Sequence, residues 1–168
     1  MGDAAVCAEP FEEYFRRLHP QAVALAVRVV GDSADAGDAA AEAFARAFAA
    51  WPKIRLLAWR DAWVLRVTAN LCFDQLRRAR RALPAGADVP GVADAVVTRV
   101  ALVTALGALP QRQREVMVLR HLAGYSEDET SRVMGVSLNT VKTHGARATR
   151  ALRALLEGGE GDWTFATG

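Results

Sequence analysis

The chain has 168 residues, of which 52% are hydrophobic and 24% are charged. This length allows one medium domain or two small ones, and the composition supplies a core and excludes a disordered chain. No apolar run reaches the roughly 18–20 residues that cross a bilayer, and no secretion signal opens the chain. We therefore expect a cytoplasmic protein without membrane insertion.

The net charge of +2 is unevenly distributed along the chain. Residues 111–156 hold eight Lys/Arg against four Asp/Glu, whereas residues 1–82 hold twelve against ten. Basic side chains gather at 77–81 and at 142–153, and such local clusters set the field that a polyanion meets. A solvated helix face remains the simpler interpretation of either cluster taken alone.

The two cysteines, Cys7 and Cys72, are too few for a disulfide framework. Neither has Cys or His neighbours at the spacing of a metal site. Cys72 falls within a helical apolar pattern, so we expect a reduced thiol in the core. The sequence indicates no metal and no other cofactor.

Helical periodicity dominates the first half of the chain. Apolar residues recur at three- and four-residue spacing over 11–29, and Gly31 ends this helix. A second helix is expected from about 35, with Ala40, Phe44, Ala47 and Phe48 on one side, as far as Trp51-Pro52. A third is expected over about 59–82, which contains no Gly or Pro. Alternating strand patterns are missing.

The best domain boundary lies at 83–91, which contains two Pro and two Gly and has no periodic pattern. After it, a helix face is expected from Val96, Val100, Val103 and Leu106. A helix over about 111–123 and two shorter units separated at Gly135 follow, before a Gly-rich acidic tail. The sequence therefore predicts an all-α fold: two small helical domains, 10–82 and 96–156, joined by a flexible linker, 83–95, with a flexible tail, 157–168.

The segment 126–144 has the features of a helix-turn-helix. Ser126 and Glu129 form a capping box at the start of a short helix, which Gly135 ends. Ser137 then offers a second N-cap, before a helix with polar residues at its start. An ordinary helical hairpin is the alternative, but capping box, glycine turn and basic second helix together favour DNA binding.

The second helix of this motif offers groups that can read DNA. Val141 and Ala148 should face inward. The residues expected to face outward are Leu138, Asn139, Lys142 and Thr143, with Arg147 and Arg150 further along. Asn139 suits an adenine edge, and Lys142 suits a guanine or a phosphate. For His144, a phosphate or backbone contact or plain exposure is expected, because no metal-ligand partner accompanies it.

Several motifs resemble the sigma-70 family. The stretches 109–116 (LPQRQREV), 124–126 (GYS), 135–137 (GVS) and 140–142 (TVK) closely resemble its region 4. The N-terminal half is similar to region 2 of the extracytoplasmic-function (ECF) class, through two series of matching residues. They are Asp35, Ala36, Gly37, Asp38, Glu42, Phe44 and Arg46, and then Trp63, Leu65, Arg66, Asn70, Leu71, Asp74 and Arg77.

The resemblance implies three sets of site residues and no catalytic one. The set for the −35 element in region 4 is Ser137, Leu138, Asn139, Thr140, Lys142, Thr143, His144, Arg147 and Arg150. The set for the −10 element in region 2 is Lys53, Arg55, Trp59, Asn70, Asp74, Arg77, Arg78 and Arg81. The set for polymerase binding is Asp35, Asp38, Glu42, Phe44 and Arg46.

As an ECF sigma factor, the chain is expected to bind core RNA polymerase, at the β′ clamp helices and the β flap, and promoter DNA. An anti-sigma factor is a further expected partner. Two departures from the family pattern stand out. Ala39, Ala40 and Ala41 replace bulkier residues of the docking helix, and the loop 53–58, which captures a flipped −10 base in the family, carries Leu56 and Leu57.

Three other classes of protein fit the sequence less well. A LuxR-type or other helix-turn-helix regulator would need a ligand-binding or phospho-acceptor N-terminal domain, for which residues 1–82 have too little β pattern. A helical adaptor or anti-sigma protein would not need a basic recognition helix. An enzyme is disfavoured, because the chain has no nucleophile–base set, metal cluster or phosphate loop.

Overall fold

Three long helices form the N-terminal half: α1 (Phe11–Val30), α2 (Ser33–Ile54) and α3 (Arg60–Ala82). They belong to a computed structural model that describes residues 9–82 and 94–157. Each of the three helices contacts the other two. The side of α2 that faces its neighbours carries small side chains with at most 1% exposure, namely Ala36, Ala39, Ala40, Ala43 and Ala47. Small residues let the helix axes approach closely, so the bundle is tight at α2.

The C-terminal half consists of α4 (Asp94–Ala108), α5 (Gln111–Met117), α6 (Glu127–Met134) and α7 (Leu138–Glu157), with a π-helical turn, η1 (Val118–Leu122), between α5 and α6. The helix expected over 111–123 is therefore α5 continued by η1. In η1 the hydrogen bonds run to the fifth residue, as from the Ala123 amide to the Val118 carbonyl at 2.9 Å. All regular elements of the described ranges are helices, which confirms the all-α class.

The ends of α1 and α2 follow local rules, with one exception. Gly31 ends α1 in the left-handed conformation, at φ 81°. The Asp32 carboxylate caps α2 by accepting from the amide of Ala34 at 2.7 Å. However, α2 does not stop at Pro52 as expected but continues to Ile54. A proline removes only one helical hydrogen bond near a helix end, and the buried Ile54 side chain holds the final turn against the core.

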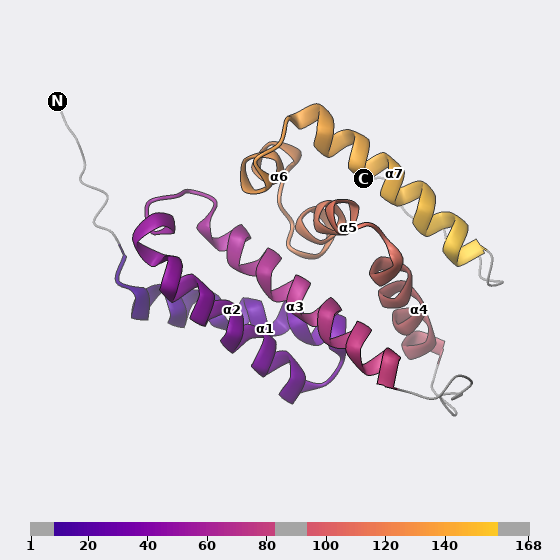
Figure 1. The fold of residues 1–168 in the computed structure, drawn as a ribbon, viewed down its shortest axis with the longest axis horizontal. Helices are drawn as coiled ribbons and strands as arrows, with labels where there is room; N and C mark the ends of the chain where they lie inside the picture. Colours follow the sequence, from indigo (N-terminus) through magenta and orange to yellow (C-terminus); the bar gives the residue numbers. More distant parts are fainter. Residues whose placement is uncertain (1–8, 83–93, 158–168) are drawn as a thin grey trace.

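The two halves pack together, with α3 in the middle (Figure 1). Helices α1 and α2 lie on one side of α3, while η1 and α6 contact it from the other side. One hydrophobic core runs through both halves and joins Phe73 of α3 to Leu106 of α4 and Leu152 of α7. A second, smaller cluster joins Ala62 of α3 to Val116 of α5 and Val141 of α7. The expected linker, apart from its last two residues, and the expected tail after Glu157 lie outside the described residues.

Helix α4 differs from the sequence expectation. Leu106 is buried and Val103 is half-buried, but Val100, expected on the same inward face, is 47% exposed. The helix is apolar on nearly all sides and packs mainly along α7. One apolar side of α4 therefore stays exposed. Because α4 is apolar nearly all round, the helical repeat of 3.6 residues does not indicate which of its sides is buried.

The described helices include none that is long and apolar enough to cross a membrane.

Candidate nucleic-acid interface

The capping box that begins the helix-turn-helix is formed. The amide of Glu129 donates to the Ser126 hydroxyl at 3.2 Å, and the amide of Ser126 donates to the Glu129 carboxylate at 2.8 Å. Hydrogen bonds from the side chain and backbone of Ser126 lower the pKa of Glu129 below its ordinary value of 4.5. Gly135 ends α6 in the left-handed conformation, at φ 64°. The local signals therefore fix the turn between α6 and α7.

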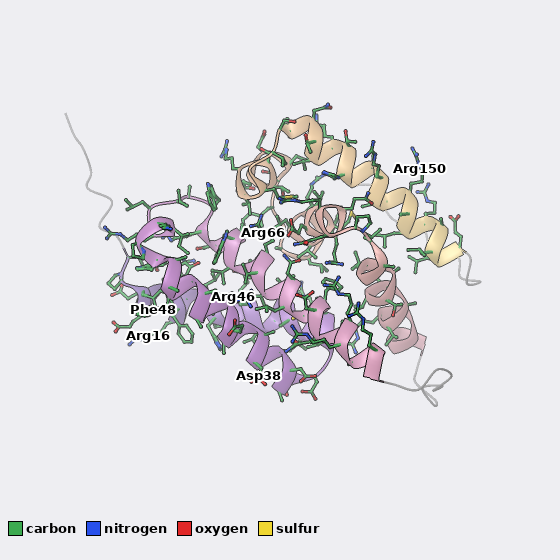
Figure 2. All side chains as sticks on the ribbon, viewed as in Figure 1. Arg16, Asp38, Arg46, Phe48, Arg66 and Arg150 are labelled. Atoms are coloured by element: carbon green, nitrogen blue, oxygen red, sulfur yellow. The ribbon has the colours of Figure 1, made fainter. Side chains whose placement is uncertain are left out.

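The second helix of the motif, α7, presents the orientation expected from its sequence. Ser137 caps it by accepting from the Thr140 amide at 3.1 Å. Val141 is 1% exposed and Ala148 is fully buried, so both face inward as predicted. The proposed base- and phosphate-reading side chains that are exposed are Leu138, Asn139, Lys142, Thr143, Arg147 and Arg150. Figure 2 shows Arg150 on the outer side of α7.

Two polar residues of α7 are less open. Thr140 is half-buried, and its hydroxyl lies 2.8 Å from that of Ser137. His144 is also half-buried, and its Nδ1 has no hydrogen-bond partner among the described residues. The described residues contain no group of His, Cys, Asp or Glu that could hold a metal ion. The exposed side of α7 is therefore polar and basic and can contact a large ligand.

A carboxylate that the sequence reasoning missed lies beside the proposed recognition residues. Glu127 accepts from Arg120 at 2.7 Å, and its second oxygen lies 4.0 Å from the Lys142 ammonium. Glu127 thus interacts with two basic side chains, Arg120 and Lys142, and partly neutralises the charge of both. Its position directly after Ser126, in the acidic first turn of α6, indicated only the start of a helix, because the contact to Lys142 depends on how α6 crosses α7.

The proposed −10 residues on α3 and just before it differ in how exposed they are. Arg78 and Arg81 are exposed, and Asp74 forms an ion pair with Arg77. Asn70 is half-buried and donates to Glu115 of α5 at 2.9 Å. Trp59, just before α3, packs half-buried against the apolar residues of the helix-turn-helix. Among the described −10 residues from Trp59 to the end of α3, those at the C-terminal end are therefore the ones open to a ligand.

Two tryptophans and a thiol of the N-terminal half belong to the core. Trp63 is half-buried against it, and Trp51 packs on Tyr14 with 4.7 Å between ring centroids. Cys72 is fully buried, which confirms the expectation of a core thiol. Burial raises the pKa of this thiol to about 12, so Cys72 is not nucleophilic at neutral pH.

Helix α2 carries an exposed acidic face. Asp35 and Asp38 are exposed, and Glu42 is paired with Arg46 at 2.8 Å. Phe44 belongs to the core with 3% exposure, so its side chain lies beneath this face and its part in polymerase binding stays a prediction. Among the three alanines that replace bulkier residues, Ala39 and Ala40 are likewise buried and only Ala41 is exposed.

Phe48 also differs from the sequence expectation. The apolar pattern put it on the same side of α2 as Phe44, but its side chain is 64% exposed. Its ring packs edge-on against Phe11 with a centroid distance of 5.0 Å. This ring therefore lies at the exposed rim of the contact between α1 and α2. Figure 2 shows Asp38, Arg46 and Phe48 on α2, away from the C-terminal helices.

The loop between α2 and α3 is open. Lys53 and Arg55 are exposed, and Leu56 is 63% exposed. Arg60, at the start of α3, donates to the Arg55 carbonyl at 3.2 Å and to Glu9 at 3.0 Å. These contacts hold the base of the loop while its tip stays accessible.

The fold and these surfaces define an all-helical protein with a C-terminal helix-turn-helix and an N-terminal bundle whose third helix ends in exposed arginines. Residues 14–82 match the family model "Sigma-70 region 2", and residues 99–152 match "Sigma-70, region 4". The chain is 39% identical over 150 residues to the ECF RNA polymerase sigma factor SigM of Mycobacterium tuberculosis, covering 87% of this chain and 76% of that protein. It is 33% identical over 153 residues to the RNA polymerase sigma-E factor of Streptomyces avermitilis, covering 88% and 85%.

The chain therefore belongs to the sigma-70 family and is an ECF RNA polymerase sigma factor. Solved structures agree with this assignment. CnrH, in complex with the cytosolic domain of CnrY, matches with a TM-score of 0.61 at 28% identity, over 89% of both chains. The sigma factor RpoE of Bartonella quintana, in complex with the anti-sigma factor NepR, has the same fold, with a TM-score of 0.57 at 20% identity over 89% of this chain and 98% of that one.

Proposed function

We propose that the chain acts without catalysis of its own: it binds core RNA polymerase through α2 and directs it to promoters through α3 and α7. The single observation that carries this division is the separation of three exposed surfaces on one helical frame. The acidic face of α2, the basic end of α3 and the polar start of α7 are all open to large ligands. Binding to RNA polymerase would place the chain in the cytoplasm.

The α7 surface suits the duplex of the −35 element. A recognition helix enters the major groove with the residues of its first turns. Asn139, Lys142 and Thr143 lie there and are exposed, and Arg147 and Arg150 continue the surface toward the phosphates. Base readout is assigned to the first turns and phosphate contact to the arginines.

The α3 surface suits the −10 element. Arg77, Arg78 and Arg81 follow one another at the exposed end of the helix. Positive charge beside aromatic side chains is the usual means of holding single-stranded DNA, and Trp59 lies at the other end of the same set. The loop with Lys53, Arg55 and the exposed Leu56 adds a surface that a displaced base can reach.

The partner of α2 is proposed to be the β′ clamp helices of core polymerase, and that of the C-terminal half the β flap. Support for the first comes from three acidic side chains that are exposed on α2: Asp35, Asp38 and Glu42. An anti-sigma factor is also proposed as a partner, because CnrH, with 28% identity and the same fold, was solved with CnrY.

Reconstitution with core polymerase tests the proposal. The purified chain should convert core enzyme into a holoenzyme that starts transcription at a promoter selected from a genomic library. Reversing Asp38 and Glu42 to Lys should abolish core binding, measured by co-elution, with the helical circular dichroism unchanged. The matched control reverses Glu12 and Glu13 of α1, which are also exposed. Core binding by the folded Asp38/Glu42 variant at wild-type affinity would contradict the docking assignment.

A further inference from the structure

Three charged side chains from three elements meet at the edge of the proposed −35 surface. Arg120 comes from η1, Glu127 is the first residue of α6, and Lys142 lies near the start of α7. Arg120 donates to one oxygen of Glu127 at 2.7 Å, and the other oxygen lies 4.0 Å from the Lys142 ammonium. Figure 1 shows α6 beside the start of α7, so this carboxylate lies next to the helix that is proposed to read DNA.

The carboxylate of Glu127 is held more firmly than the ammonium that it faces. The side chains of Glu127 and Arg120 are 31% and 33% exposed, whereas that of Lys142 is 56% exposed. The Nε atom of Arg120 is buried, so the guanidinium that donates to Glu127 has little freedom to turn. Hydrogen bonds between two charged groups are also stronger than those between neutral ones. Glu127 therefore presents its second oxygen to α7 at a nearly constant place.

Lys142 is attracted by this carboxylate but keeps its hydrogen-bonding capacity. A separation of 4.0 Å is an ion pair without a hydrogen bond, so the three N–H donors of the ammonium stay available. The lysine stem is flexible, and an attraction from one side limits the directions that it takes. The ammonium can face Glu127 and at the same time donate to a guanine acceptor in the major groove.

The same carboxylate acts against the phosphates of DNA. It is negatively charged and accepts hydrogen bonds without donating any, so it repels the backbone of every duplex. A Lys142 side chain that turns away to pair with a phosphate also loses its attraction to Glu127. That attraction is kept when the ammonium donates to a base from its position beside the carboxylate. Complexes that rely on phosphate contacts are therefore weakened more than a complex with base readout.

Resting on the proposed role of α7, we infer that Glu127 determines specificity at the −35 surface. It holds the Lys142 ammonium toward the α6 side of α7, in reach of a base acceptor, and opposes its movement to the phosphates of other sequences. Glu127 acts through Lys142 and is a positioning residue, which needs no contact with DNA of its own. The ligand that this arrangement favours is a duplex with guanine opposite Lys142.

Glu127→Gln in the full chain tests this role, because the amide keeps the side-chain size and an oxygen for Arg120 but removes the charge. Asp128→Asn is the matched control. Asp128 is the next residue of the same acidic turn, is exposed, and has no ion pair among the described residues. The probes are two labelled duplexes, one that the wild-type chain selects from a random library and one with the same bases in scrambled order. Fluorescence anisotropy over a salt series gives both affinities, and circular dichroism reports the fold.

Glu127→Gln should bind the scrambled duplex about two- to fivefold more tightly, the range that exposed ion pairs contribute. Its affinity for the selected duplex should rise less, so the ratio of the two affinities should fall. The slope of log affinity against log salt on the scrambled duplex should steepen by up to about 0.9, the value for one new phosphate contact. Asp128→Asn should shift both affinities equally and leave their ratio unchanged.

A double variant shows whether the effect passes through Lys142. In a Lys142→Ala background, Glu127→Gln should leave the ratio of the two affinities unchanged. Loss of discrimination in that background overturns the inference, as does an equal shift of both affinities by Glu127→Gln alone. Transcription from the wild-type holoenzyme decides the proposed function separately. A chain that starts transcription while Glu127→Gln keeps wild-type discrimination retains the proposed function and loses only this inference.

Discussion

Replacing Lys142 with Ala tests the placement of the recognition helix. The side chain is 56% exposed near the start of α7, and its nearest carboxylate oxygen, on Glu127, lies 4.0 Å away. Its ammonium is thus available to DNA and only weakly neutralised. If it contacts a phosphate, its loss reduces the slope of log affinity against log salt by about 0.9. The wild-type advantage over the variant then shrinks about 3.5-fold between about 50 and about 200 mM salt.

If Lys142 instead reads a guanine, the loss is concentrated at one base pair and amounts to about 1–3 kcal/mol of discrimination. Fluorescence anisotropy of a labelled −35 duplex, measured over a salt series and with each base pair substituted in turn, separates the two cases. Arg153→Ala is the matched control, because Arg153 is an exposed basic residue in the last turn of the same helix. A Lys142→Ala chain with wild-type affinity, salt slope and base preference refutes the assignment.

Substitutions of Ser126 and of Leu119, with Leu155 as the control for Leu119, test which side chains stabilise the C-terminal half. Ser126→Ala removes the cap of α6 and should cost about 1 kcal/mol of unfolding free energy in urea. Because the pKa of Glu129 is lowered in the fold, the difference from wild type should be complete above pH 4.5 and shrink as the pH falls below it. Leu119→Ala, at a fully buried position, should cost about 2–5 kcal/mol, whereas Leu155→Ala, at a position 50% exposed, should cost about 0.5 kcal/mol. Equal losses at the two leucines, or a Ser126→Ala effect independent of pH, would contradict these assignments.

The helix-turn-helix could be predicted from the sequence because its determinants are local. Ser126 and Glu129 are three residues apart, and Gly135 ends α6 by its own backbone conformation. Such signals act within one turn of helix and need no knowledge of the partner helices. The inward positions of Val141 and Ala148 followed from the same register.

The positions that differ from the sequence expectation depend on which helices pack against one another. Phe44 and Phe48 are one turn apart on α2, and the 3.6 period alone placed both inward. Phe44 packs against Tyr14 and Phe15 in the core, whereas Phe48 contacts Phe11 and stays 64% exposed. The contact between Asn70 and Glu115 joins residues 45 positions apart, and no local pattern specifies it. Residues suited to DNA can equally be held by another part of the same chain.

The linker and the interface between the halves make a joint prediction. A protease recognition site inserted after Gly86, in the expected linker, should allow cleavage of the folded chain into an N-terminal and a C-terminal fragment. Because one apolar core runs through both halves and arginine–carbonyl bonds cross between them, the fragments of the wild-type chain should co-elute in size-exclusion chromatography. In an Ala62→Glu background, where a charge is placed in the smaller apolar cluster between the halves, the same cleavage should release two separately eluting fragments. Wild-type fragments that separate at once would mean that the linker alone holds the halves together, and the packed arrangement would then not persist in solution.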